Sequence, residues 1–367
     1  MDRTTPGRGD SMRVALLANL KKNAPTWPGM APDMWDDLDA EETIEAISQA
    51  LESRGHQVAF LEGDHTLFEN LKKLQPEICF NICEGHFGDS REAQVPAILE
   101  FLGIPYSGSR VLTLALCLDK PMTKRVLTYH DLPTPAFQVF ERLDEELDRS
   151  VVHFPCFVKP SREGTGMGVS ARSIVHNETE LYDQLQQVFE RYNQPALVER
   201  FIEGREVTVG VVGNLTRPAA RRLPEDDEAP RIFGGLHIFP PLEVNMAAYP
   251  ADEGGVYTGH IKVEMAHDFH YMCPAPLTPE QIEELNWLAA ATFRVTGCQD
   301  VARVDFRLDA HDNDRPYILE INPLPGLNPD YSDLCIEARA DGWSYEELVN
   351  RILDEAVGRY RLKSAGR

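Results

Sequence analysis

Two short apolar runs near the C-terminal end of the chain each end in polar residues that could bind a metal ion. The first run contains Arg303 and Asp305, and the second ends in Glu320 and Asn322. If the runs pair as a hairpin, the side chains of Asp305, Glu320 and Asn322 can converge. Oxygen ligands of this kind suit Mg²⁺, which binds carboxylates together with substrate phosphates. Arg303 lies two residues before Asp305, so on the same strand face, where it could stabilise developing negative charge. On spacing alone, an acidic hairpin with a solvated rim explains the pattern equally well.

A second candidate site lies at residues 159–168, where a strand-like run ends in Lys159 and a loop with three glycines follows. Backbone N–H groups beside glycine can approach phosphate oxygens closely, and a lysine adds positive charge. The lysine precedes the glycines and the GK[ST] sequence is absent, so this is not a Walker loop. A flexible hairpin loop is the alternative. The small and hydroxyl-bearing residues of the loop are Ser161, Gly164, Thr165, Gly166 and Gly168.

Two acidic residues, Glu199 and Glu206, bracket a short turn between apolar strands. A carboxylate there could accept hydrogen bonds from an adenine amino group or from ribose hydroxyls, although exposed acids at strand edges are the simpler interpretation. Lys120 directly follows Asp119, which is suited to cap a helix. A lysine at a helix start is poorly placed for the helix dipole. An anionic binding partner would explain a lysine at this position, although a lysine exposed to solvent is the more common case.

The elements around these residues indicate an α/β protein. Strands are expected at 12–18, 57–61 and 77–82, a capping box at 39–42 opens a helix, and a helix over 92–102 ends at Gly103. This alternation predicts an open α/β domain whose ligands bind at the carboxyl ends of the strands. Further strands are expected at 154–159, 196–201 and 205–212, further helices at 119–130 and 178–191, and capping boxes at 278–281 and 344–347. Residues 217–230 are expected to form an exposed loop.

Composition narrows the class of protein. The chain has 367 residues, 43% of them hydrophobic and 26% charged, and a net charge of −23. This charge argues against binding to nucleic acid or to an anionic membrane, so an anionic substrate would need a local basic pocket. No apolar run is long enough to span a membrane, and no secretory signal is evident. The seven scattered cysteines fit reduced thiols in a cytoplasmic protein.

Taken together, the motifs resemble the ATP-grasp superfamily, and specifically its D-alanine–D-alanine ligase-like branch. The stretches that carry the resemblance are 103–109, 119–120, 159–168, 198–206, 273–275 and 303–326. The resemblance implies a mixed α/β fold of three parts after a disordered tail at 1–11. These are an N-terminal open α/β domain at 12–115, a central ATP-grasp lid at 116–200, and a C-terminal ATP-grasp domain at 201–367.

The resemblance also implies roles for individual residues. Lys120, Lys159 and Lys262 match phosphate-binding lysines, and the loop with Ser161, Gly164, Thr165 and Gly166 matches the phosphate loop. Glu199, Phe201 and Ile202 match the adenine site, Glu206 the ribose-binding acid, Asp305, Glu320 and Asn322 the Mg²⁺ ligands, and Arg303 the arginine at the acyl intermediate. Lys159, Thr165, Lys262 and Arg303 are the expected catalytic residues. The implied reaction is ATP-dependent, ADP-forming ligation of a small carboxylate to an amine through an acyl phosphate, in a homodimer.

The substrate contacts depart from the pattern of D-alanine–D-alanine ligases. Their N-terminal Ser-x-Glu loop, which anchors an ammonium group, is replaced by 35–39, where Asp36 or Asp37 could take over. Their His-Gly loop becomes 83–88. The expected substrate residues are Asp36, Asp37, Glu84, His86, Arg91, Gly326, Ser332 and Asp333. We interpret these changes as retained chemistry with a substrate other than D-alanine. The alternatives are a genuine D-alanine–D-alanine ligase and a non-catalytic nucleotide-binding regulator.

Overall fold

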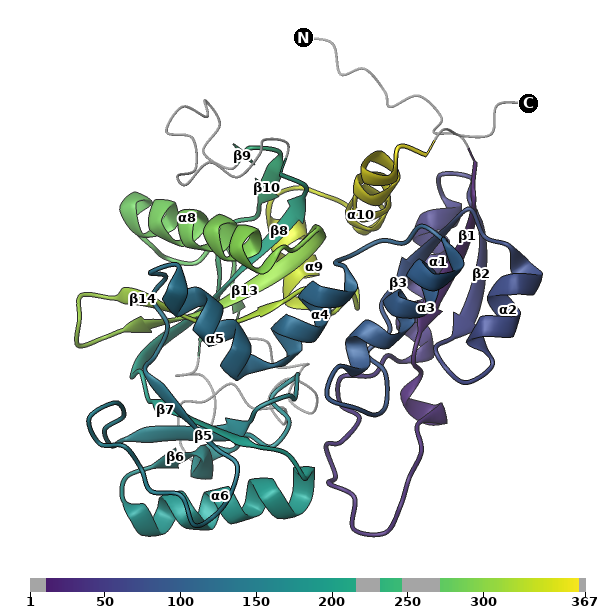
Figure 1. The fold of residues 1–367 in the computed structure, drawn as a ribbon. Helices are drawn as coiled ribbons and strands as arrows, with labels where there is room; N and C mark the ends of the chain where they lie inside the picture. Colours follow the sequence, from purple (N-terminus) through teal and green to yellow (C-terminus); the bar gives the residue numbers. More distant parts are fainter. Residues whose placement is uncertain (1–10, 216–231, 246–270, 363–367) are drawn as a thin grey trace.

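The computed structural model describes residues 11–215, 232–245 and 271–362, and the strands within them form three sheets (Figure 1). Residues 1–10 of the predicted tail at 1–11, the predicted loop at 217–230 and Lys262 lie outside the described residues. The mixed α/β class is confirmed. The domain boundaries after residues 115 and 200 stay predictions.

The first sheet is parallel and has the order β2-β1-β3. Its central strand is buried from Val14 to Ala18, as expected of a parallel strand that is covered on both faces. The helix that leads away from this sheet ends at Gly103, whose φ of 68° gives the left-handed cap that glycine favours. The elements are β1 (Arg13–Ala18), β2 (Gln57–Glu62), β3 (Ile78–Asn81), α1 (Glu41–Glu52), α2 (Leu67–Leu74) and α3 (Gln94–Leu102).

The capping box predicted at residues 39–42 is wrong. The N-cap of α1 is Ala40, and no side chain caps the helix. Asp39 is held instead by its backbone, whose N–H donates to the carbonyl of Asn19 (3.1 Å) and whose carbonyl accepts from Lys21 N–H (3.0 Å). This pairing places Asp39 one residue before the cap and leaves its carboxylate beside a pocket.

The middle sheet is antiparallel, with the order β4-β7-β5-β6, and α6 packs on it through a core of aliphatic residues. Its strands β5 and β7 run side by side over five residue pairs, which places Lys159 opposite Leu197 and Phe157 opposite Glu199. The elements are β4 (Phe137–Phe140), β5 (Cys156–Pro160), β6 (Ile174–Val175), α6 (Glu178–Tyr192) and β7 (Ala196–Arg200).

The large sheet has seven described strands and is organised around β8 and β13, which pair over their full lengths. The hairpin predicted near the C-terminal end is confirmed, because β13 also pairs with β14. The predicted capping box at Thr278 and Gln281 opens α8. The elements are β8 (Gly204–Gly213), β9 (Ile232–Phe233), β10 (Leu236–Ile238), β11 (Leu242–Val244), β12 (Tyr271–Met272), α8 (Pro279–Thr296), β13 (Asp300–Asp309) and β14 (Arg315–Asn322).

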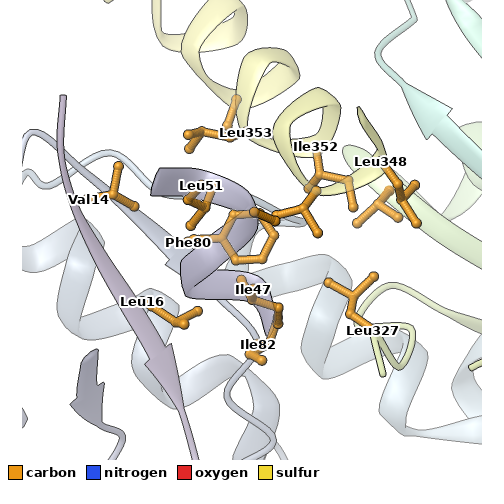
Figure 2. Packing of buried hydrophobic residues seen from close by; sticks show 14 of the residues in the cluster. Val14, Leu16, Ile47, Leu51, Phe80, Ile82, Leu327, Leu348, Ile352 and Leu353 are labelled. Atoms are coloured by element: carbon orange, nitrogen blue, oxygen red, sulfur yellow. The ribbon is translucent and has the colours of Figure 1, made fainter. Parts of the chain in front are cut away.

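Of four further described helices, two lie between the first and middle sheets in chain order and two follow the last strand. The predicted capping box at Ser344 and Glu347 is confirmed and opens the last helix. That helix, α10, packs against α1 and against residues of the first and large sheets in one continuous core (Figures 1 and 2). The two ends of the described chain therefore share one core. The helices are α4 (Val111–Leu118), α5 (Lys120–Tyr129), α9 (Asp333–Ala340) and α10 (Tyr345–Tyr360).

We expect Leu353→Ala to lower the free energy of unfolding by about 2–5 kcal/mol, because it leaves a cavity in this core. Leu353 is fully buried, whereas Leu112, also in a helix, is 79% exposed. The matched control Leu112→Ala should change stability by less than about 0.5 kcal/mol. Urea unfolding measures both. Equal effects would show that α10 is not part of the folded core.

Candidate active site

The β13–β14 hairpin brings the predicted metal ligands together. Asp305 lies opposite Glu320, and Arg303 lies opposite Asn322. The Asn322 amide donates to Oδ2 of Asp305 at 2.9 Å, and Thr208 donates to Oδ1 at 2.7 Å. Within the described ranges, no three His, Cys, Asp or Glu side chains form a complete metal cage. Two carboxylates and an amide instead fit an ion such as Mg²⁺, which takes its remaining ligands from water and phosphate.

Arg303 lies on the same face of β13 as Asp305, as the spacing predicted. Its Nε and one terminal nitrogen donate to the two oxygens of Asp305, both at 2.8 Å. Asp333 approaches the other terminal nitrogen at 3.7 Å. Burial opposes the positive charge, but the carboxylates of Asp305 and Asp333 raise the pKa of Arg303 above its usual value. A fixed guanidinium is thus held next to the metal-ligand pair.

Lys120 points into the site and not into solvent. It is the first residue of α5, where Asp119 caps the helix by accepting from Met122 N–H at 2.9 Å. Its Nζ donates to the carbonyl of Glu163 at 2.5 Å and pairs with Glu320 at 3.1 Å. The interpretation of Lys120 as a solvated lysine is therefore wrong, because the helix start is buried against the glycine loop and β14.

Glu199 is buried between two lysines, which excludes the interpretation of an exposed strand-edge acid. One oxygen pairs with Lys159 and the other with Lys124, each at 2.7 Å. Burial favours the neutral form of Glu199, but the two ammonium groups lower its pKa below the usual value. The sequence analysis missed Lys124. Its position four residues after Lys120 on one helix was the available signal, since residues at this spacing share a helix face.

The glycine loop follows β5 and turns sharply. Thr165 and Gly166 have φ values of 51° and 73°, and positive φ is rare for a β-branched residue. The N–H of Gly168 donates to Oδ2 of Asp33 at 2.8 Å, and the hydroxyl of Tyr192 donates to the same carboxylate. The loop is therefore tied to the segment before α1, which a flexible surface hairpin would not be.

Most of the residues predicted to bind the nucleotide line one cavity of about 90 Å³ between the middle and large sheets. Its polar wall includes Arg307, which the sequence analysis missed and which pairs with Glu206 at 3.4 Å. Ser161, Gly164 and Thr165 do not line this cavity. The predicted residues that do are Lys120, Lys159, Gly166, Glu199, Phe201, Ile202, Glu206, Asp305 and Glu320.

A second cavity, of about 170 Å³, adjoins the first and shares Lys120 and Glu163 with it. Ser332 lies close to the Pro-Gly turn, and its Oγ accepts from Asn328 N–H at 2.9 Å. The predicted residues that line this cavity are Asp36, Asp37, Glu84, Gly164, Thr165, Arg303, Asn322, Gly326, Ser332 and Asp333.

Two predicted substrate residues, His86 and Arg91, do not line the second cavity. They border a neighbouring hollow together with Trp27, Trp35 and Phe87. Arg91 is engaged within the protein, because it pairs with Asp37 at 3.0 Å and Glu163 at 3.1 Å. Their contact with a substrate stays a prediction.

The arrangement corresponds to a known fold. The crystal structure of D-alanine–D-alanine ligase from Bacillus anthracis, complexed with ATP, matches with a TM-score of 0.70 over 96% of this chain and 99% of its own. At 22% sequence identity, this likeness concerns the fold. The three sheets with a cavity between the middle and large ones thus define an ATP-grasp fold.

Sequence comparisons identify the family. The model described as the D-ala D-ala ligase C-terminus matches residues 126–225 and 240–354. The D-alanine–D-alanine ligase of Pseudothermotoga lettingae is 34% identical over 85% of this chain and 93% of its own. The D-alanine–D-alanine ligase of Syntrophotalea carbinolica is 35% identical over 85% of this chain and 89% of its own. The uncharacterized protein y4sG of Sinorhizobium fredii is 31% identical over 95% of this chain and 98% of its own. The chain therefore belongs to the D-alanine–D-alanine ligase family, whose members are ligases that form carbon–nitrogen bonds. The resemblance inferred from the motifs is confirmed.

We expect Glu199→Gln to destabilise the protein by about 3–5 kcal/mol at pH 7, because it leaves two buried lysines without their shared carboxylate. A matched control is Glu178→Gln, whose side chain is 57% exposed and pairs with Arg149 on the surface. Such surface pairs contribute less than about 1 kcal/mol. Urea unfolding measures both variants.

The pH dependence gives a second readout of the same pair. Because the folded-state pKa of Glu199 is lowered from 4.5, its stabilisation is present above pH 4.5 and is lost as the pH falls through the folded-state value. The difference between wild type and Glu199→Gln should therefore shrink below about pH 4.5. A difference that stayed constant down to pH 3 would contradict the charged pair.

Proposed function

We propose that the chain is an ATP-dependent, ADP-forming ligase that joins an amino acid or small carboxylate, other than D-alanine, to an amine. The observation that carries the proposal is the junction of the two cavities at Lys120 and Glu163, with Arg303 on the wall of the second cavity. A nucleotide in the first cavity and a carboxylate in the second would meet at this junction.

In the first step, a carboxylate oxygen of the substrate attacks the γ-phosphorus of ATP. The bond from that phosphorus to ADP breaks, and an acyl phosphate forms. Lys120 and Lys159 line the nucleotide cavity, so their ammonium groups would bind and orient the phosphates in place of their present partners. Asp305, Glu320 and Asn322 would hold Mg²⁺, which when bound neutralises phosphate charge and aligns the transferred group.

In the second step, the amine nitrogen attacks the acyl carbon, and an oxyanion develops on the carbonyl oxygen. Arg303 lines the second cavity with its charge fixed by Asp305, so it would stabilise this oxyanion. The carbon–oxygen bond to phosphate then breaks, the nitrogen loses its proton, and the amide and inorganic phosphate result. Asp333, close to Arg303, would attract an incoming amine and not a carboxylate.

A genuine D-alanine–D-alanine ligase is the second candidate. Relatives that carry this name share 34–35% identity with the chain, which favours it. Against it stand the replaced loop at 35–39 and the loop at 83–88. A regulator without catalysis is disfavoured, since binding alone does not require a charged arginine at the acyl centre. A homodimer also remains part of the proposal.

We expect ADP release to require both Mg²⁺ and a carboxylate substrate, and Asn322→Ala to raise the Mg²⁺ concentration for half-maximal rate by about 10–100-fold. The reason is that Asn322 both belongs to the proposed ligand set and orients Asp305. Asn70→Ala on α2 is the matched control and should behave as wild type. Unchanged Mg²⁺ dependence in a folded Asn322→Ala protein would refute the metal site.

We also expect D-alanine to be a poor substrate. By the resemblance, the loop at 35–39 replaces the ligases' Ser-x-Glu loop, Thr165 their loop serine, and Val263 the tyrosine that follows the lysine matched by Lys262. Each unmet polar group costs about 1–3 kcal/mol. Two such losses lower kcat/KM by about two to four orders of magnitude, and the hydroxyl of Thr165 would reduce this effect. The measurement compares kcat/KM for ADP release with D-alanine against the values for a panel of amino acids and amines. Efficient synthesis of D-alanyl-D-alanine would contradict the proposal and show that the chain is a D-alanine–D-alanine ligase.

A further inference from the structure

Seven acidic residues line the second cavity, and three of them pair with basic residues: Asp36 with Lys21, Glu163 with Arg91 and Asp333 with Arg303. The other four, of which Asp37 shares Arg91 with Glu163, all come from segments of the first domain. Asp37 and Asp39 come from the segment before α1, Glu84 from the loop after β3, and Glu92 from the 3₁₀ turn before α3. Arg303 on β13 and the residues from Asn322 to Gly326 after β14 line the same cavity from the large sheet. The cavity thus has one wall suited to an acyl centre and one wall that is strongly acidic.

These four carboxyl groups have almost no partners among the residues that the structure describes. Asp39, Glu84 and Glu92 make neither a side-chain hydrogen bond nor an ion pair there. Only Oδ2 of Asp37 is paired, with Arg91 at 3.0 Å. The Arg91 guanidinium also pairs with Glu163 at 3.1 Å and donates a hydrogen bond to the carbonyl of Arg162 at 2.7 Å.

Asp37 gives an independent indication that the second cavity takes a ligand. Its side chain is only 5% exposed, and its Oδ1 is buried without a hydrogen-bond partner. A buried carboxylate oxygen without a donor is unfavourable. Asp37 borders the second cavity, so a cationic donor bound in that cavity would lie beside this carboxylate.

The raised pKa values of three of these carboxyl groups agree with a binding site for a cation. Burial, together with repulsion from Asp37, raises the pKa of Asp39 to about 7. Burial also raises the pKa of Glu92 to about 7, despite the opposing charges of Arg91 and Lys120. Burial and the negative charges of Glu92 and Asp37 raise the pKa of Glu84 well above its usual value. Among the described residues, the positive charges near these four carboxyl groups therefore do not balance them.

The missing cation is better matched by an organic molecule than by a metal ion. In the described part of the chain, no three carboxylates, imidazoles or thiols converge closely enough to hold one ion. The acids are instead spread over two loops, with Asp37 and Asp39 on one and Glu84 and Glu92 on the other. Two separated nitrogen cations on one molecule could each meet one of these pairs.

We infer that the carboxylate substrate is an amino acid with a positively charged side chain, such as lysine, ornithine or arginine. This inference rests on the proposed function and narrows its substrate class. The carboxylate would face Arg303 and the junction with the nucleotide cavity. The α-ammonium and the side-chain cation would occupy the acidic wall, where a neutral side chain would leave buried carboxyl groups unpaired.

The first test compares lysine with norleucine, which has the same chain length without the charge, in both enantiomers. With one saturating amine, we expect the KM for ADP release to be about 10–100-fold lower for one enantiomer of lysine, from one charge-assisted contact. Equal KM values for lysine and norleucine would overturn the inference, and so would a requirement for a diamine in place of a basic amino acid. In each case ADP release itself would still support the ligase.

The second test removes one acid without changing its shape. Glu84→Gln should raise the KM for lysine by about 10-fold or more, and leave the KM for norleucine and for ATP near wild type. Glu69→Gln, whose side chain is 63% exposed on α2, is the matched control and should change none of them. An equal rise in KM for lysine and norleucine would show that Glu84 supports the pocket but does not recognise the charge of the side chain, and would refute the inference.

A third measurement keeps the inference testable without turnover. Because the Glu84 carboxyl group has no partner among the described residues, the melting temperature of Glu84→Gln should equal or exceed that of wild type. If this variant does not fold, Glu92→Gln replaces it in the same assays. Calorimetric titration with lysine and norleucine, in the absence of ATP, measures the preference directly. If no amino acid gives ADP release, the proposed function fails, whereas a lysine preference in calorimetry would still support the cationic pocket.

Discussion

The pairing of β13 on both of its edges is the constraint on which the site depends. This strand pairs with β8 over ten residues and with β14 on its other side. Because alternate side chains of a strand face opposite ways, this register sends Arg303 and Asp305 to the site while Val304 and Phe306 enter the core. A slip by one residue would exchange the two sets. The same hydrophobic burial that stabilises the large sheet therefore positions the charged groups.

The two cavities differ in how the charges of their acidic side chains are balanced. In the nucleotide cavity each acid has a cationic partner, as Glu199 has in Lys124 and Lys159. The net charge of −23 required a local basic site for an anionic substrate, and these lysines supply it. In the second cavity the acids outnumber their partners. A site that is already neutralised can bind phosphates by exchanging partners, whereas a site with surplus acids gains most from a cation.

Sequence reasoning succeeded where the signal was local. The capping boxes at Thr278 and Ser344 formed, because each places a hydroxyl and an acceptor three residues apart on one turn. It failed at Asp39, where pairing with Asn19 and Lys21 overrides the local preference. It also missed α4, a continuous apolar segment for which periodicity cannot separate helix from strand. Lys124 escaped notice because its burial depends on Glu199, which is distant in sequence.

The loop that carries Asp37 is also the loop that holds the glycine loop in place. Asp33 accepts from Gly168 N–H and from the Tyr192 hydroxyl, and Arg91 links Asp37 to Glu163 and to the carbonyl of Arg162. Residues 33–37 thus contact both the second cavity and the glycine loop. A substitution in this segment therefore acts both on the lining of the second cavity and on the support of the glycine loop. The departures from the ligase pattern lie in this segment and in the loop at 83–88, whereas β13 and β14 keep the residues that match the metal-binding and oxyanion positions of the ligases.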